Sequence, residues 1–97
     1  MMEVKDYLLA CLSEESGEIA QAVGKAHRFG LLDKNPVSGL TNWVELRGEV
    51  HDLIAVYEML CDKFDQAEAL DRKLIEVKKE RVTDYMVYSH GLGRLAS

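Results

Sequence analysis

The chain has 97 residues, which is enough for one domain and leaves no room for a second independent core. Twelve Lys and Arg residues oppose seventeen Asp and Glu residues, giving a net charge of −5. This acidic balance argues against a nucleic-acid-binding protein, which normally needs a basic patch. Hydrophobic residues make up 47% of the sequence and charged residues 30%, proportions of a globular chain and not of a disordered one.

The cysteines and the N-terminal region indicate a cytoplasmic protein. Cys11 and Cys61 are far apart and neither belongs to a Cys-x-x-Cys pair, so no zinc ribbon or redox motif is indicated. One disulfide is arithmetically feasible, but two buried free thiols are the expectation. The apolar run from Tyr7 to Leu12 is too short for a signal peptide or a membrane span.

An amphipathic helix is predicted from about residue 3 to residue 27. Its apolar face carries four residues at helical spacing: Val4, Leu8, Cys11 and Ala22. Basic residues crowd its last turn, where cations suit the helix dipole, and Gly30 can end it. Residues 30–41 then form an irregular connection that is long for so small a domain, and such loops are often functional.

Two further helices are predicted after this loop. Thr41 or Asn42 can cap the second helix, whose apolar stripe recurs at spacings of four and three: Leu46, Val50, Leu53, Tyr57, Leu60 and Phe64. A third helix is predicted over about 65–82, with a short fourth helical turn over 84–88. The apolar face of the third helix would carry Ala67, Leu70, Leu74 and Val77. The expected fold is therefore an all-α bundle, one domain with its core at about 3–82 and a tail at about 89–97.

Carboxylates interrupt the apolar stripes of the first two helices. At about 100° per residue, Glu15 points in the same direction as the first apolar stripe, and Glu18 lies about 60° to one side. Glu14 is turned about 100° away, at the edge of that face. On the second helix, Glu49 lies about 40° and Asp52 about 100° to the same side of Leu53.

Two helices therefore each offer a pair of carboxylates toward a shared interior. Burying unpaired charge costs several kcal/mol for each group, so these carboxylates need neutralising partners. Divalent cations are the simplest partners, and oxygen ligands favour Mg²⁺ or Mn²⁺ over zinc. A Mg²⁺ ion held by carboxylates is in turn a site for substrate phosphates. A solvated acidic face, or pairing with Lys and Arg of a neighbouring helix, is the alternative explanation.

The sequence Glu14-Glu15-Ser16-Gly17-Glu18, followed after the loop by Glu49-Val50-His51-Asp52, resembles the EExxE…ExxD signature of the MazG-like all-α nucleoside triphosphate pyrophosphohydrolases. The stretches 25–31 and 40–42 are similar to small phage-type members of that superfamily. The likeness covers residues 5–82. His51 departs from the pattern, because relatives usually have a small or amide residue there.

The resemblance implies an all-α fold that assembles as a dimer or, more readily, a dimer of dimers, with each active site completed by two subunits. It also implies Mg²⁺-dependent cleavage of a (deoxy)nucleoside triphosphate between the α and β phosphates, giving monophosphate and pyrophosphate, with Mn²⁺ able to substitute. Glu15, Glu18, Glu49 and Asp52 would be ligands of two or more ions. Glu14 and Glu15 would be the catalytic carboxylates, with Glu14 as a ligand or a water-orienting group.

Substrate contacts are expected from both ends of the loop and from the third helix. Lys25, Arg28 and Lys79, the last beside Lys78 and Arg81, are candidates for the outer phosphates. For Lys79 and its neighbours a solvated helix face is the alternative. Asn42 can read a base edge and Trp43 can stack on a base, although Trp43 fits core packing equally well.

Other functions remain open at this point. A nucleotide phosphohydrolase of the same fold that accepts diphosphates is one alternative, and a non-catalytic acidic helical module that dimerises or binds a protein is another. An HD-type phosphohydrolase would need more histidines over a longer chain. A ferritin-like di-iron site is excluded, because Glu49 and His51 are about 200° apart on the helix.

Overall fold

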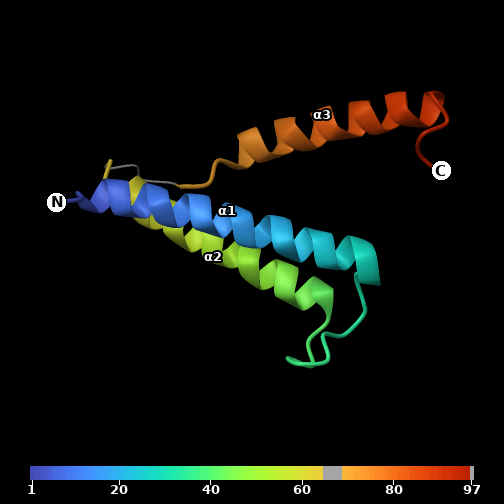
Figure 1. The fold of residues 1–97 in the computed structure, drawn as a ribbon. Coiled ribbons are helices and arrows are strands. Elements are labelled where there is room, and N and C mark those ends of the chain that lie inside the picture. The colour runs from blue at the N-terminus through green and yellow to red at the C-terminus, as the bar shows by residue number, and fades with distance from the viewer. Residues whose placement is uncertain (65–68, 97) are drawn as a thin grey trace.

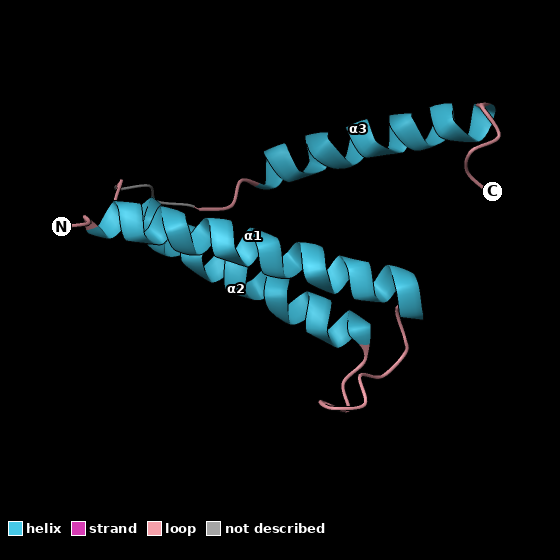
Figure 2. Cartoon of the chain, viewed as in Figure 1, coloured by secondary structure: helices cyan, strands magenta, loops and turns pink. Residues whose placement is uncertain are grey.

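The computed structural model describes residues 1–64 and 69–96, which form three helices: α1 (Val4–Phe29), α2 (Asn42–Asp62) and α3 (Arg72–Gly91). Figures 1 and 2 show their arrangement. Within those residues, β-type pairing is limited to one isolated antiparallel bridge between Lys34 and Thr41. The all-α class predicted from the sequence is therefore confirmed. No helix in the described part of the chain is both long enough and apolar enough to cross a membrane.

α1 and α2 form an antiparallel hairpin whose helix ends follow the local sequence. α1 ends at Gly30, which adopts a φ of 100° and donates its backbone N–H to the Ala26 carbonyl at 2.9 Å. α2 begins after Thr41, whose hydroxyl oxygen accepts a hydrogen bond from the Val44 backbone N–H at 3.2 Å. Both helices thus lie within two residues of the start and end predicted from periodicity and caps.

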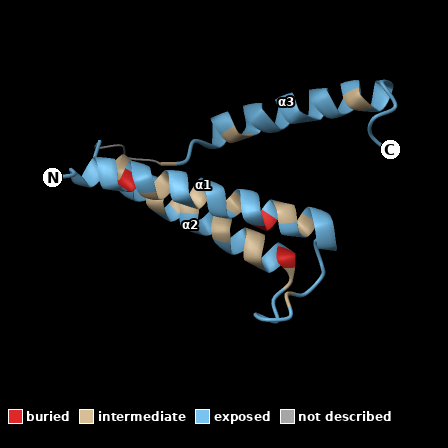
Figure 3. Ribbon diagram, in the orientation of Figure 1, coloured by how far each residue is buried: buried red, intermediate tan, exposed pale blue. Residues whose placement is uncertain are grey.

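The interior of the hairpin is thin. Leu8 and Ala22 are the buried apolar residues of the described chain, at 5% and 8% exposure, and both come from α1 (Figure 3). The two cysteines are free thiols, as expected, but they are half-buried and not fully buried. Two helices have only one mutual seam to bury. Along the apolar stripe of α2 and its end, Leu46, Leu53 and Leu60 are therefore half-buried, whereas Val50, Tyr57 and Phe64 remain exposed.

The loop between α1 and α2 is held by backbone pairing rather than by packing. Asn42 and Trp43 donate their backbone N–H groups to the carbonyls of Asp33 and Leu31, at 2.9 and 2.8 Å. The Asn42 side chain is only 5% exposed, and its Nδ2 donates to the Gly30 carbonyl at 2.8 Å. These bonds attach both ends of the loop to the first turn of α2 and give it one defined shape.

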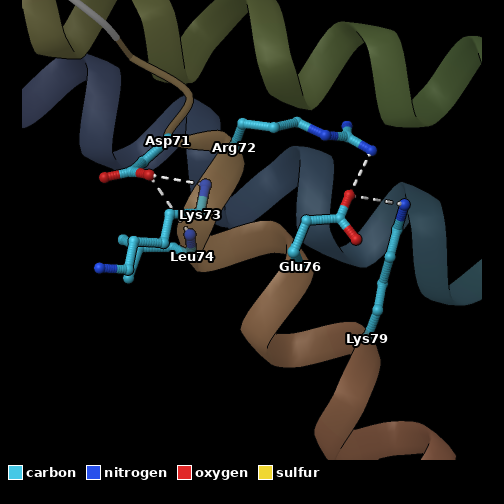
Figure 4. Close-up of polar contacts among 6 residues, drawn as sticks. All are labelled: Asp71, Arg72, Lys73, Leu74, Glu76 and Lys79. Carbon is cyan, nitrogen blue, oxygen red and sulfur yellow. Dashed lines mark hydrogen bonds and ion pairs between the residues drawn. The ribbon is translucent and has the colours of Figure 1, made fainter.

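α3 differs from the predicted third helix at both ends. The Asp71 carboxylate caps it by accepting the backbone N–H groups of Lys73 and Leu74 (Figure 4), so residues 69–71 are not helical. The first predicted residues, 65–68, lie outside the described residues. The separate turn expected at 84–88 was wrong, because nothing interrupts the helix before Gly91. α3 is therefore one continuous helix.

α3 packs against neither α1 nor α2 in the described part of the chain. It contains no buried residue, and Leu74 on its apolar face is 68% exposed. The radius of gyration is 17.0 Å, whereas a compact chain of this length has about 12.5 Å. The hairpin and α3 therefore lie apart within a single chain, as Figure 1 shows.

The hydroxyl cap of α2 leads to a prediction about stability. Thr41→Ala removes the acceptor of the Val44 N–H group and should lower the free energy of unfolding by about 1 kcal/mol. This corresponds to a fall of roughly 4–8 °C in the melting temperature, measured by circular dichroism. Thr41→Ser keeps the oxygen and should retain most of that stability. Equal losses in both variants would assign the effect to the lost methyl group instead.

Candidate metal centre

The antiparallel hairpin brings Glu15 of α1 opposite Glu49 and Asp52 of α2. One carboxylate oxygen from each residue lies within 4.8 Å of the other two. Glu15 and Glu49 are half-buried, and Asp52 is exposed. Three of the four carboxylates that helical spacing directs toward the shared interior therefore converge on one point of the seam, and the fourth, Glu18, lies outside this group.

The positions of these acids follow from helical spacing. Glu49 and Asp52 are three residues apart and so occupy one side of α2. Glu15 lies on α1 between the two buried apolar residues, Leu8 and Ala22, which hold that side of α1 against α2. The same apolar contacts that form the hairpin therefore fix the position of the acidic cluster.

Burial and repulsion between like charges act together on the cluster. Partial burial raises the pKa of Glu15 above its usual value, and the neighbouring charges of Asp52, Glu49, Glu14 and Glu18 raise the pKa further, in that order. Four of the five predicted carboxylates thus raise the pKa of the fifth, Glu15. Glu14 and Glu18 stand outside the close group of three and are exposed.

No basic side chain in the described residues neutralises this cluster. The ion pairs of the described residues all lie away from the cluster. Lys5 pairs with Glu3 at the start of α1. Arg72 and Lys79 both pair with Glu76 on α3 (Figure 4). The alternative expectation was that a Lys or Arg of a neighbouring helix pairs with these acids. No such ion pair is present among residues 1–64 and 69–96. The donor set consists of carboxylate oxygens alone, which fits a hard divalent cation such as Mg²⁺ or Mn²⁺ and not zinc.

The predicted substrate contacts divide into two groups. Lys25, Arg28 and Asn42 line one pocket of about 380 Å³ between the end of α1 and the loop. Trp43 is 49% exposed and does not line that pocket, and Lys79 lies on α3, where its ammonium pairs with Glu76 at 3.3 Å. The structure therefore brings three of the five candidates together.

The pocket also contains residues that sequence analysis missed, among them Lys34, Asn35 and Phe29. Lys34 and Asn35 belong to the irregular loop, where no periodicity assigns a side chain to a face. Two features of the sequence could have pointed to these loop residues: the length of the loop, and its position directly after the basic end of α1.

His51 lies on the exposed side of α2, between the two acids in sequence but away from them in space. Its Nδ1 is 2.6 Å from the Arg47 carbonyl oxygen, and because a carbonyl only accepts, Nδ1 carries the proton. The imidazole is therefore engaged by its own helix.

Comparisons with models of protein families, with curated proteins and with solved structures gave no match to this chain. The geometry of the acidic cluster and the sequence pattern on which it rests are consequently the basis for a functional assignment.

The raised pKa of Glu15 gives a prediction with a definite sign. The folded protein binds the Glu15 proton more tightly than the unfolded chain does, so stability without metal falls as pH rises from the ordinary carboxyl pKa through the raised value. Glu15→Gln removes this loss and should raise the melting temperature at pH 7 in EDTA. The gain should vanish at a pH below the ordinary carboxyl pKa.

The control is Glu58→Gln, which removes one negative charge from an exposed position of α2 outside the cluster. It should leave the melting temperature in EDTA nearly unchanged. An equal gain in both variants would attribute the effect to net charge and not to repulsion at Glu15.

Proposed function

We propose that this protein is a Mg²⁺-dependent (deoxy)nucleoside triphosphate pyrophosphohydrolase of the MazG-like kind, which releases a nucleoside monophosphate and pyrophosphate. The observation that carries the proposal is the convergence of Glu15, Glu49 and Asp52 within 4.8 Å, with no cationic partner in the described residues. The same three residues belong to the EExxE…ExxD pattern. Because nucleoside triphosphates are cytoplasmic metabolites, the proposed activity is a cytoplasmic one.

The cluster fits the proposed cofactor. Glu15, Glu49 and Asp52 would hold Mg²⁺ or Mn²⁺, with Glu18 on the adjoining turn of α1 as a further ligand to one of two or more ions. When bound, the ions supply positive charge against the phosphate oxygens and increase the acidity of the attacking water. Glu14 remains exposed beside this group, and its carboxylate would accept a proton from that water or orient it.

The proposed enzyme acts as a homo-oligomer, as a dimer or as a dimer of dimers. α3 buries no residue within its own chain, and four of its apolar side chains, those of Leu74, Tyr85, Val87 and Tyr88, are more than 60% exposed. A hairpin of two helices also leaves the cluster open on one side. A second copy that packs along the hairpin and α3 would cover both surfaces and enclose the nucleotide.

The activity is tested with a panel of the common dNTPs, NTPs and their diphosphates, scored for monophosphate, phosphate and pyrophosphate in Mg²⁺ and in Mn²⁺. We expect monophosphate and pyrophosphate from triphosphates, and no turnover in EDTA. Glu49→Gln and Asp52→Asn should each lower the rate more than about 100-fold, because loss of residues that merely support metal ligands already costs 10- to 100-fold.

Glu58→Gln is the matched control on the same helix and should retain activity. The ligand variants should keep the helical content of the wild type, since the substitutions conserve side-chain shape. Full activity in Glu49→Gln and Asp52→Asn would exclude the cluster as the catalytic site. Turnover of diphosphates alone would favour the diphosphate-accepting alternative, and no turnover at all would favour the acidic interaction module.

The oligomer is tested by sedimentation velocity. Leu74→Glu places a charge on the exposed apolar face of α3 and should shift the protein from dimer or tetramer toward monomer, with loss of activity. Thr83→Glu makes the same change about 180° around the helix and should leave the assembly intact. A wild-type protein that sediments as a monomer at micromolar concentration would contradict this part of the proposal.

A further inference from the structure

We infer that the pocket between the end of α1 and the α1–α2 loop binds the outer phosphates of the nucleotide, the two that leave together as pyrophosphate. The inference rests on the proposed function and adds to it a separate site for the leaving group. It also gives a physical reason for preferring triphosphates over shorter nucleotides.

The loop that forms the pocket is held in a defined shape by its own hydrogen bonds. Asn35 donates its backbone N–H to the Leu40 carbonyl at 2.9 Å, and the Asn35 side-chain oxygen accepts the Val37 N–H at 2.8 Å. Ser38 donates to the Glu45 carboxylate of α2 at 2.6 Å. These bonds fix the loop opposite Lys25 and Arg28, so a ligand would meet a preformed site of about 380 Å³.

The charges around the pocket favour an anion. Lys25, Arg28 and Lys34 line it together with a single carboxylate, that of Asp33. None of the three cations is in an ion pair within the described residues. In a chain of net charge −5, three unpaired cations around one cavity form a local positive site.

A structural role accounts for only part of this arrangement. Arg28 lies near the C-terminal end of α1, where cations suit the helix dipole, and its guanidinium is 5.2 Å from the centre of the Phe29 ring. Lys34 is outside the helix, on the other wall of the pocket, and neither explanation applies to it. A phosphate chain is the ligand chemistry that uses all three cations together.

The pocket lies closer to the loop end of the hairpin than the acidic cluster does. Lys25 follows Glu15 of the cluster by ten residues, or about 15 Å along α1, and Asn42 precedes Glu49 by seven residues, or about 10 Å along α2. Side chains of a helix lean toward its N-terminus, so the Lys25 ammonium extends back toward the cluster. A nucleotide held at the cluster can therefore extend its phosphate chain toward Lys25.

Side chains, rather than backbone groups, would hold these phosphates. The first N–H groups of α2 are already used, since those of Asn42, Trp43 and Val44 donate to Asp33, Leu31 and Thr41. Asn42 likewise uses its Nδ2 for the Gly30 carbonyl. Removing lysines should therefore weaken binding directly and leave the fold of the loop intact.

The experiment titrates inorganic tripolyphosphate into the ¹⁵N-labelled full-length protein in EDTA, followed by NMR. We expect shifts centred on Lys25, Arg28, Lys34 and Asn42. The double variant Lys25→Ala/Lys34→Ala should bind tripolyphosphate at least about tenfold more weakly, since hydrogen bonds to charged groups each contribute about that factor. The control, Lys5→Ala/Lys73→Ala, removes two exposed lysines elsewhere and should bind as the wild type does.

Further measurements separate this inference from the proposed function. In Mg²⁺, the double variant should raise KM for the preferred triphosphate about tenfold, while Mn²⁺ binding measured by electron paramagnetic resonance stays unchanged. Equal tripolyphosphate affinity in the double variant and the control would overturn the inference, even in an active enzyme. The same shifts produced by a nucleoside without phosphate would also overturn it. Intact tripolyphosphate binding in a protein with no hydrolysis would instead overturn the proposed function.

Discussion

Repulsion among carboxylates in the seam between α1 and α2 is the constraint on which the arrangement depends. Glu15, Glu49 and Asp52 are drawn together because apolar neighbours on the same helix faces pack, although their charges alone would keep them apart. Partial burial in this packing, followed by the charges of the neighbouring carboxylates, raises the pKa of Glu15. A chain that needed only stability would gain by replacing one of these acids, and their joint presence supports the cation site proposed above.

The hairpin also determines how the two charged regions are related. The acids lie midway along α1 and α2, and the basic pocket lies at the end where the loop joins the two helices. One pair of helices thus separates opposite charges along its length. A polyanion bound through metal ions would meet negative charge only at the centre, and positive charge beyond it.

Periodicity predicted α1, α2 and the cluster well, because helical spacing alone determines which residues share a face. The same reasoning failed for α3. Its start depends on one capping carboxylate, that of Asp71, and its length on the absence of any residue that breaks a helix before Gly91. The pocket was predicted only in part. The role of Lys34 depends on backbone bonds within the loop, and no repeating pattern in the sequence encodes those bonds.

The exposed α3 has a consequence for the thermodynamics of this chain. A helix that buries nothing within its own molecule gains almost no packing energy there, and an isolated helix of 20 residues is only marginally stable in water. In the proposed oligomer the order of α3 would be coupled to association, so that folding and assembly would share one free energy. The stability of the protein would accordingly depend on its concentration, and dilution would act on it as a denaturant does.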